Sequence, residues 1–502
     1  MTTNPNLAAV EALEPKSVWR AFAELAAVPR PSKHEEKVRV HVRKTAEKLG
    51  FKVREDQIGN LVIEVPATPG HERAPVTVLQ GHLDMVCEKN SGTQHDFDKD
   101  PIRLVLDKDP KSGAPIIRAA GTTLGADNGI GVAFGFAAAT DPSVTHGPLE
   151  ILCTLDEEMG MTGAKELQPE FLKGRRLLNL DSEEDDAIYI GCAGGCDTTY
   201  IWEFKTAAPP KGSEVARIRV AGLRGGHSGV DIHLNRASAL KLLVRTLRGV
   251  NDTKIQIANL TGGSKRNVIP REASAVVVGP KGTLAQLAQA AAEVQEEAMQ
   301  HAGEATCTIQ IEKLPAAQAK AVASRKDTQR LLTALAAVPH GVLAVVPEIA
   351  GLIQTSNSMS TVESRRAKGM LRIVVGCLSR SSSMPQLHAT AQQLAALGAL
   401  AGAKVEAGNA YPGWQPNVAS PLLATCKQIY ERMFNETPKI AAIHAGLECG
   451  IIGERIGAGT MDMVSFGPHI VGAHSPDEHV YVDSVAKSWK YLTAVLGELA
   501  KA

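Results

Sequence analysis

The sequence predicts an α/β protein whose catalytic domain, built on a helix-covered central β-sheet, is interrupted by a two-lobed α+β lid domain. Three features predict this fold class. Short strand-like runs alternate with helical runs up to about residue 200, a different series follows, and the alternating pattern returns near residue 404. Because 502 residues exceed what one hydrophobic core usually supports, we expect a catalytic domain at 1–200 and 404–502. The inserted lid, of a type that can dimerise, is expected at 201–403.

Two helices are expected at the start of the catalytic domain. Trp19, Phe22 and Leu25 share one face of the first helix, which ends before a pair of prolines. We expect Ser32 to cap a second helix that ends at Gly50. The elements expected next are the helix Asn128–Thr140 and the strands Asn60–Val65, Val76–Gln80, Leu149–Leu155 and Leu177–Leu180.

The lid is expected to contain two comparable series of strands and helices. The first series comprises Glu214–Val220, Arg236–Gly249, Ala273–Val278, Thr283–His301 and Thr306–Glu312. The second series runs from Thr328 to Gly402 and includes the strand Met370–Gly376 and the helix Gln386–Leu400. The returning catalytic domain is expected to contain the helix Pro421–Phe434, the strand Asp462–Phe466 and the helix Ser484–Ala500.

The composition, with 44% hydrophobic and 22% charged residues, is that of an ordinary soluble globular protein, which we expect in the cytoplasm. Basic and acidic residues number 54 each, so the charge balance gives no reason to expect nucleic acid or an anionic membrane as a partner. The N-terminal residues do not resemble a secretory signal, and the longest apolar run is too short to span a bilayer. The eight cysteines show no disulfide-framework spacing, so we expect reduced, mostly buried thiols.

Potential metal ligands follow several of the predicted strands. They occur in the segments QGHLDMV, GADNGIG, LDEE, NLD and GAHSPDE, and they are His82, Asp127, Glu157, Glu158, Asp181 and His474. In open α/β sheets, ligands bind at the carboxyl ends of strands, so we expect these side chains to converge.

Five of these residues are enough to hold two zinc ions. A catalytic zinc takes about three protein ligands. We expect Asp127 to bridge the two ions, which in such sites lie roughly 3.5–4 Å apart. His82 and Asp181 would complete the first site. Glu158 and His474 would complete the second site. Zinc, manganese and cobalt all remain open as the physiological metal.

The two remaining carboxylates have natural roles beside this site. Asp84, two residues from His82, is expected to hold the imidazole through its other ring nitrogen. Glu157 and Glu158 are expected at the end of a strand, where neighbouring side chains point to opposite faces, so Glu157 would point away from Glu158 and act as the general base for an attacking water.

Each of these residues also has a structural interpretation. His82 alone could be a buried structural histidine, and the DEE triplet could be a solvated turn. Asp127 could be a helix N-cap, and Asp181 could be ordinary surface charge. Only the whole set, in this order along the chain, favours a metal site.

The segments GHLDMV, GADNGIG, LDEEMG, NLDSEE and GAHSPDE resemble the metal-site segments of the M20 group of zinc aminopeptidases, dipeptidases and deacylases. AIHAGLECG at 442–450 and GCLSRSSSM at 376–384 are similar to segments of the aminoacyl-histidine dipeptidases within that group. The resemblance extends over nearly the whole chain. It implies the ligand and base assignments above and a lid inserted into a catalytic domain.

The resemblance also implies substrate-contacting residues in the lid. His227, in GLRGGHSGVDIH, would stabilise the oxyanion of the tetrahedral intermediate, and Asn267, in GGSKRNVIPREA, would contact substrate. Arg380 is our choice for binding the substrate carboxylate, with Arg365, Arg366 and Arg372 as competitors. His444 and Glu448 are candidates to line the site, although buried packing explains them nearly as well.

The expected reaction is hydrolysis of small unblocked peptides, above all Xaa-His dipeptides including β-alanyl-histidine. A water that bridges the two ions, deprotonated by Glu157, would attack the peptide carbonyl. An N-acyl amino acid deacylase using the same site and a non-catalytic metal-binding scaffold are the alternatives. The oligomeric state stays open between a monomer and a homodimer.

Overall fold

The computed structural model describes residues 4–250, 254–347, 349, 351–457 and 459–501. The chain divides into two compact units. Unit 1 comprises residues 1–191, 416–442 and 447–502, and unit 2 comprises residues 192–415 and 443–446. None of the described helices is long and apolar enough to cross a bilayer. Six of the eight cysteines are buried, in agreement with the expectation of mostly buried thiols.

Unit 1 is built on an eight-stranded mixed sheet with the order β1-β2-β6-β3-β7-β21-β8-β20. Its central neighbours β6, β3, β7 and β21 run parallel. The strands are β1 (Lys52–Glu55), β2 (Leu61–Val65), β3 (Thr77–His82), β6 (Leu149–Thr154), β7 (Arg176–Asn179), β8 (Ala187–Cys192), β20 (Lys439–Ile443) and β21 (Asp462–Ser465). The carboxyl ends of the parallel strands therefore lie along one edge of the sheet.

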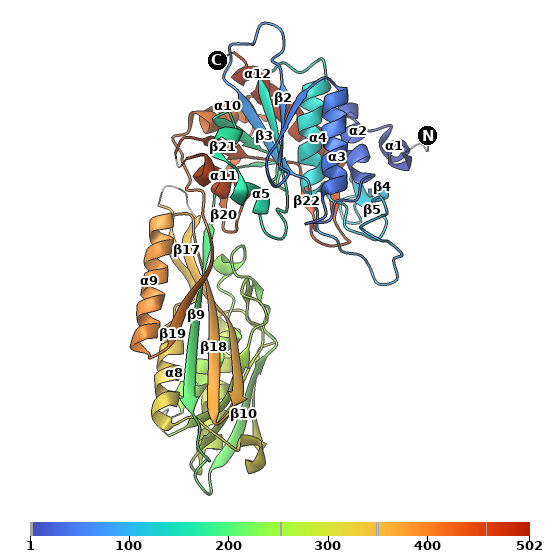
Figure 1. The fold of residues 1–502 in the computed structure, drawn as a ribbon. Coiled ribbons are helices and arrows are strands. Elements are labelled where there is room, and N and C mark those ends of the chain that lie inside the picture. Colours follow the sequence, from blue (N-terminus) through green and yellow to red (C-terminus); the bar gives the residue numbers. More distant parts are fainter. Residues whose placement is uncertain (1–3, 251–253, 348, 350, 458, 502) are drawn as a thin grey trace. The chain divides into compact units, whose positions relative to one another are not determined.

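Helices bury the centre of this sheet. Every residue of β3 and β6 is buried, and α4 (Ala126–Thr140), itself apolar on nearly all sides, packs against both strands. The helices α2 (Lys16–Ala26) and α12 (Val482–Leu499) pack on α4, where Phe134 and Trp489 stack with ring centroids 6.0 Å apart (Figure 1). The remaining helices of unit 1 are α1 (Pro5–Val10), α3 (Glu36–Lys48), α5 (Thr162–Glu166), α10 (Pro421–Phe434) and α11 (Glu448–Ile456).

Unit 1 also contains a small antiparallel sheet that the sequence did not predict. Its order is β22-β23-β5-β4, and its strands are β4 (Leu104–Lys108), β5 (Pro115–Ala119), β22 (Ile470–Val471) and β23 (His479–Tyr481). β22 and β23 pair as a hairpin, so the segment 472–478 between them is fixed at both ends.

Unit 2 is built on one nine-stranded antiparallel sheet. The strand order is β15-β10-β14-β12-β17-β18-β9-β19, with β16 paired to β17, so the two expected lobes share one continuous sheet. Its strands are β9 (Gly194–Lys205), β10 (Glu214–Ala221), β12 (Gln256–Gly262), β14 (Ala273–Gly279), β15 (Thr308–Leu314), β16 (Gly341–Val345), β17 (Ile353–Ala367), β18 (Met370–Ser381) and β19 (Lys404–Tyr411). The helices α6 (Ala239–Gly249), α7 (Thr283–His301), α8 (Arg325–Ala337) and α9 (Met384–Leu400) pack on it around one hydrophobic core (Figure 1).

One expected helix cap is wrong. α3 begins at Glu36, its N-cap Glu35 makes no side-chain capping bond, and the hydroxyl of Ser32 instead donates to Oδ2 of Asp84 at 2.8 Å. The hydroxyl forms a stronger hydrogen bond as donor to the buried carboxylate than it would form as acceptor from a backbone N–H at the start of the helix. The contact with Asp84 therefore replaces the local cap.

Candidate metal centre

Five side chains from separate elements of unit 1 converge at the edge of the sheet where the parallel strands end. His82 is the last residue of β3, and Asp181 comes two residues after β7. Glu158 lies in the turn after β6, and Asp127 lies in the first turn of α4. His474 lies in the turn between β22 and β23. His474 and Asp127 are thus the two members of the group that do not follow a strand of the main sheet.

The carboxylate of Asp127 faces a different histidine with each of its oxygens. Oδ1 lies 3.1 Å from Nε2 of His82, which is also 3.4 Å from Oδ1 of Asp181. Oδ2 of Asp127 lies 3.3 Å from Nε2 of His474, which is also 3.0 Å from Oε2 of Glu158. Two groups of three ligand atoms are thus formed, and Asp127 belongs to both groups.

The spacing of these atoms fits zinc coordination. Ligand bonds of about 2.0–2.2 Å in a tetrahedral arrangement place neighbouring donor atoms about 3.3–3.6 Å apart. The four contacts of 3.0–3.4 Å described above are close to that separation. In addition, Oε1 of Glu158 and Oδ1 of Asp181 are inaccessible to solvent and have no hydrogen-bond donor among the described residues. Buried carboxylate oxygens without donors are expected where a cation is to be held.

The charges of the group also favour a cation. Burial raises the pKa of Asp181 to about 7. Hydrogen bonds to Asp127 and Glu158 raise the pKa of His474 to about 11. The shift of His474 reflects the carboxylate charge around it, which divalent ions would neutralise.

Asp84 links several parts of the site. Its carboxylate accepts hydrogen bonds from the backbone N–H of Glu157 (3.0 Å) and of Glu158 (3.2 Å) as well as from Ser32. Oδ1 of Asp84 lies 3.3 Å from Nδ1 of His82, the ring nitrogen that faces away from Asp127. Burial opposes ionisation of this carboxyl group, but these partners hold its pKa at about 2. Asp84 is therefore placed to orient both the imidazole and the turn that carries the two glutamates.

Glu157 lies in this turn and not on the strand. β6 ends at Thr154, so the expectation that alternation along a strand separates Glu157 from Glu158 had the wrong geometric basis. The turn, whose preceding residue Asp156 has a positive φ of 54°, sets the two directions. Burial raises the pKa of Glu157 well above its usual value, and the nearby carboxylates of Asp181, Glu448 and Glu158 act in the same direction.

Two buried residues that the sequence analysis did not single out anchor the loops of the site. Glu478 accepts hydrogen bonds from the backbone N–H groups of Leu124 (2.7 Å), Gly125 (2.9 Å) and Ala126 (2.8 Å), directly before Asp127. Its position in the GAHSPDE segment, which also contains His474, could have identified Glu478 from the sequence.

Arg30 is the second anchor. Its guanidinium donates to the carbonyl oxygens of Leu83 (3.0 Å), Asp84 (2.9 Å) and Gly125. It therefore ties the loop that follows β3 to the loop that precedes α4. Only its place between two prolines, which hold an extended segment, marks it in the sequence.

Glu448, expected near substrate, is fully buried at the start of α11 in unit 1. One carboxylate oxygen accepts hydrogen bonds from Nε2 of Gln80 (2.7 Å) and Oγ1 of Thr154 (2.6 Å). The other oxygen has no partner among the described residues, and burial raises the pKa of this carboxyl group to about 8. The placement supports the structural interpretation of Glu448 at least as well as the substrate-contacting one.

Unit 2 brings three of the other predicted residues together. Arg380 is only 4% exposed, and it donates from Nη1 to the hydroxyl of Tyr411 at 2.6 Å, while Nη2 lies 3.5 Å from Nε2 of His227. His444 is buried beside Ser356, with its Nε2 2.7 Å from Oγ. A Cβ on the intervening Gly229 would lie 2.2 Å from the carbonyl oxygen of His444, so only glycine permits this approach.

The hydrogen bonds of His227 determine its tautomer. Its Nδ1 accepts from the backbone N–H groups of Gly229 (3.3 Å) and Val230 (3.0 Å), so the proton of the neutral ring is on Nε2. Burial and the neighbouring Arg380 lower the pKa of His227 to about 4, which keeps the ring neutral. An Nε2–H group directed away from the loop is what a neutral oxyanion donor requires.

Asn267 lies beside His227 where two short strands of unit 2 pair. His227 pairs with Val268 in the short ladder of β11 (Gly226–His227) and β13 (Val268–Ile269), and the carbonyl oxygen of Asn267 accepts from the N–H of Ser228 at 2.8 Å. The side chain of Asn267 is exposed. The predicted competitors Arg365 and Arg372 are exposed, and Arg366 donates to the carbonyl oxygen of Ala258. Burial thus distinguishes Arg380 from its competitors.

Comparison with known proteins gives one family and several similar chains. The model of peptidase family M20/M25/M40 matches residues 78–498. The chain is 41% identical over 488 residues to cytosol non-specific dipeptidase of Escherichia coli (strain K12), covering 97% of this chain and 98% of that protein. Its fold is similar to that of aminoacylhistidine dipeptidase from Vibrio alginolyticus, with a TM-score of 0.88, 39% identity and coverage of 97% and 98%. Aminopeptidase PepT from Bacillus cereus ATCC 10987, at 17% identity over 97% of this chain and 99% of that one, shares the fold with a TM-score of 0.58.

Proposed function

The chain belongs to peptidase family M20/M25/M40, as the sequence motifs predicted, and on this premise we propose that it is a binuclear metallopeptidase that hydrolyses unblocked dipeptides. The observation that carries the proposal is the position of Asp127, which shares one carboxylate between two histidine-containing groups. The dipeptidase activity printed in the names of the Escherichia coli and Vibrio proteins supports the substrate class.

We assign the metal ligands from the two groups of donor atoms. His82, Asp127 and Asp181 would hold one ion, and the second would be held by Asp127 with Glu158 and His474. The two nitrogen and several carboxylate donors suit zinc, and they would also accept manganese or cobalt. Bound ions would polarise the scissile carbonyl and increase the acidity of a water molecule beside it.

Glu157 is the proposed general base and acid. Its carboxylate takes a proton from the attacking water and returns a proton to the departing amine, a role that needs a pKa raised toward neutrality. Burial raises the pKa of Glu157 in this way. Asp84 fixes the backbone of Glu157 and the ring of His82 at the same time, so we assign it a positioning role.

Unit 2 supplies the proposed substrate contacts. The Nε2–H group of His227 would donate to the oxyanion, and Arg380 would bind the carboxylate of the substrate. Arg380 supports this because it is buried, its Nε lacks a partner among the described residues, and no described carboxylate lies within ion-pairing distance. Asn267 and His444 remain proposed substrate contacts of lesser weight.

The names of the two relatives differ in the dipeptides that they specify. The Vibrio protein is named for aminoacyl-histidine substrates, whereas the Escherichia coli protein is named non-specific. We propose that Xaa-His dipeptides, including β-alanyl-histidine, are hydrolysed among a wider set. The name of the Escherichia coli relative also supports the cytoplasmic location that the composition predicted.

A substrate panel tests the proposal. The metal-loaded protein should hydrolyse free dipeptides and leave the same dipeptides intact when the amino group is acetylated. Preference for N-acyl amino acids would make the chain a deacylase, and inactivity on every substrate with both metals bound would favour a non-catalytic scaffold. Comparison of histidine with alanine and leucine at the second position measures the Xaa-His preference.

A further inference from the structure

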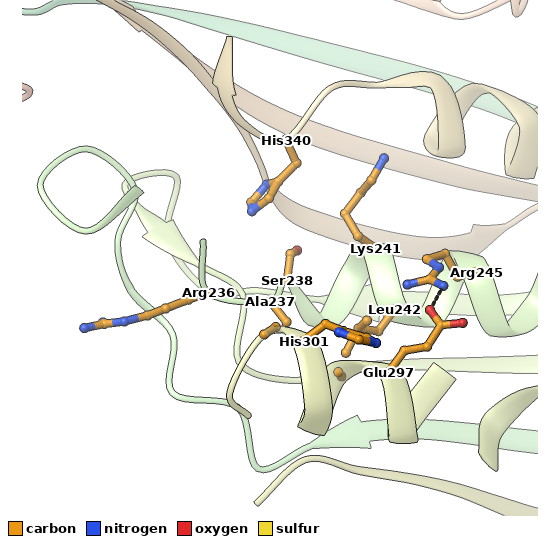
Figure 2. Close-up of a pocket in the computed structure, with 11 residues that line it drawn as sticks. Arg236, Ala237, Ser238, Lys241, Leu242, Arg245, Glu297, His301 and His340 are labelled. Atoms are coloured by element: carbon orange, nitrogen blue, oxygen red, sulfur yellow. Dashed lines mark hydrogen bonds and ion pairs between the residues drawn. The ribbon is translucent and has the colours of Figure 1, made fainter. Parts of the chain in front are cut away.

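Unit 2 contains a cavity of about 340 Å³ between α6, α7 and the residues before β16. Figure 2 shows the side chains around it. The polar groups that line it are mostly basic or hydroxylic: Arg236, Ser238, Lys241, Arg245, His301 and His340. None of them belongs to the residues assigned above to hydrolysis.

The hydroxyl of Ser238 is available to a ligand. Ser238 is 3% exposed, and its Oγ has no hydrogen-bond partner among the described residues. It is the N-cap residue of α6, yet its side chain makes no capping bond. The hydroxyl therefore lines the cavity at the positive end of an 11-residue helix.

His340 presents a second group without partners. Neither of its ring nitrogens is accessible to solvent, and neither has a hydrogen bond among the described residues. In Figure 2 the imidazole of His340 and the hydroxyl of Ser238 extend toward the same space. Ser238 is buried and His340 is half-buried, and the inaccessible polar atoms of both are costly unless a ligand or ordered water completes their hydrogen bonds.

Among the described lining residues, Lys241 is the one lysine or arginine without a carboxylate partner. The ammonium of Lys241 donates to the carbonyl oxygens of Leu335 (3.1 Å), Ala336 (2.9 Å) and Val338 (2.7 Å), and no described carboxylate pairs with it. Arg245 is paired with Glu297, the one acidic residue of the lining. Carbonyl groups therefore use all three donors of Lys241, which can supply charge to the wall but no hydrogen bond to a ligand. The guanidinium of Arg236 extends away from the cavity, so we do not count it as a ligand group (Figure 2).

We propose that this cavity binds a small phosphate-bearing anion through the hydroxyl of Ser238 and the ring N–H of His340. The positive end of α6 and the charge of Lys241 favour a multiply charged oxyanion. Helix N-termini and lysine point charges suit a phosphate group, whereas a carboxylate is bound best by a free guanidinium fork, which Arg245 does not offer. The space is large enough for a phosphate monoester as well as for free phosphate.

The test uses titration calorimetry of the metal-loaded full chain with inorganic phosphate and with glycerol 3-phosphate. Ser238→Ala and His340→Gln should each weaken binding about tenfold or more, as expected for loss of a hydrogen bond to a charged group. The matched controls Ser264→Ala and His388→Gln, at exposed positions of unit 2, should bind as the wild type does. Tighter binding of the ester would identify a phosphorylated metabolite as the ligand, and equal binding would identify free phosphate.

A crystallographic measurement keeps the proposal testable if a variant does not fold. Wild-type crystals soaked with selenate, a tetrahedral anion located by its anomalous signal, should show a peak within hydrogen-bond distance of Oγ of Ser238. Anions also bind metal centres, so dipeptide hydrolysis in the presence of phosphate is measured in parallel, and its inhibition should be equal in all variants. Unchanged phosphate affinity in both Ser238→Ala and His340→Gln, or selenate peaks only outside the cavity, would overturn the proposal.

Discussion

Nε2 of His474 lies 3.3 Å from Oδ2 of Asp127, which joins a turn of the small sheet to the first turn of α4. The other oxygen of Asp127 faces His82, at the end of a strand of the main sheet. One carboxylate therefore connects ligands from two sheets, and the consequences of removing it differ from those of removing a terminal ligand.

Asp127→Ala should abolish binding of both metal ions, whereas His474→Ala should weaken one of them. A shared carboxylate serves two groups of donor atoms, and a terminal histidine serves one. Zinc titration of the metal-free variants, followed by calorimetry and metal analysis, measures both stoichiometries. Two intact sites in Asp127→Ala would contradict the binuclear assignment.

Glu157→Gln should keep both metals and lose about 10²–10⁴-fold in kcat, the usual contribution of a general base. Glu158→Gln should instead lose metal, because Oε2 of Glu158 belongs to the group around His474. Metal content and steady-state rates are measured on the same preparations. If Glu157→Gln lost a metal equivalent and Glu158→Gln did not, the two roles would be exchanged.

His227→Ala should lower kcat and kcat/KM by similar factors of about 10²–10³, because an oxyanion donor acts in the transition state. Its metal content should not change. His233→Ala is the matched control, since His233 is a nearby exposed histidine whose Nδ1 lies 2.9 Å from the carbonyl oxygen of Val230. A rise in KM alone would make His227 a substrate-binding residue.

Mixing His227→Ala chains with Glu157→Gln chains tests whether the histidine acts on its own chain. Recovery of activity would mean that His227 serves a neighbouring subunit. Absence of recovery in a stable mixed oligomer would mean that both residues act within one chain.

Glu478→Gln should weaken metal binding without removing a ligand. The carboxylate accepts from backbone N–H groups before Asp127, and an amide nitrogen placed there would face donors. We expect metal affinity to fall by about 10–100-fold, the usual effect of losing a residue that orients ligands. Asp477→Asn, at the exposed neighbouring position, should leave the zinc dissociation constant unchanged. Equal dissociation constants for Glu478→Gln and wild type would remove Glu478 from the support of the site.

His340 should make unit 2 less stable as the pH falls. Burial, with a smaller effect of Lys241, lowers its pKa to about 4, against about 6.5 in an unfolded chain. Between these pH values the unfolded state therefore binds more protons than the folded state. The part of the free energy of unfolding that depends on neutral His340 is complete above about pH 6.5 and is lost as the pH falls toward 4.

Denaturant unfolding of wild type and of His340→Gln over this pH range measures the effect. The wild type should lose at most about 1.4 kcal/mol per pH unit more than the variant, which corresponds to one proton. His227 and His444 also have lowered pKa values but are present in both proteins, so their effects cancel in the comparison. Identical slopes would show that His340 is not a neutral buried group.

Local sequence patterns predicted most of the described helices and the central strands of the main sheet. α7 and α10 begin and end at the predicted residues, because apolar periodicity and a proline at the start of α10 act within the segment itself. The strands β4, β5, β22 and β23 were missed, since short strands carry little periodicity and are stabilised by partners distant in the chain. The hydroxyl of Ser32 was wrongly predicted to cap α3 for the same reason, because its preferred acceptor is on another loop.

The sequence by itself determined the residue types of the candidate site and their order after the strands, since parallel strands bring their carboxyl ends to one edge of a sheet. Only the tertiary structure decided which oxygen of Asp127 faces which histidine, and that Glu478 and Arg30 hold the loops around it. The physical reason is that strand position follows from local alternation of side chains. The direction of a carboxylate in a loop instead depends on donors and charges that the fold brings from distant segments.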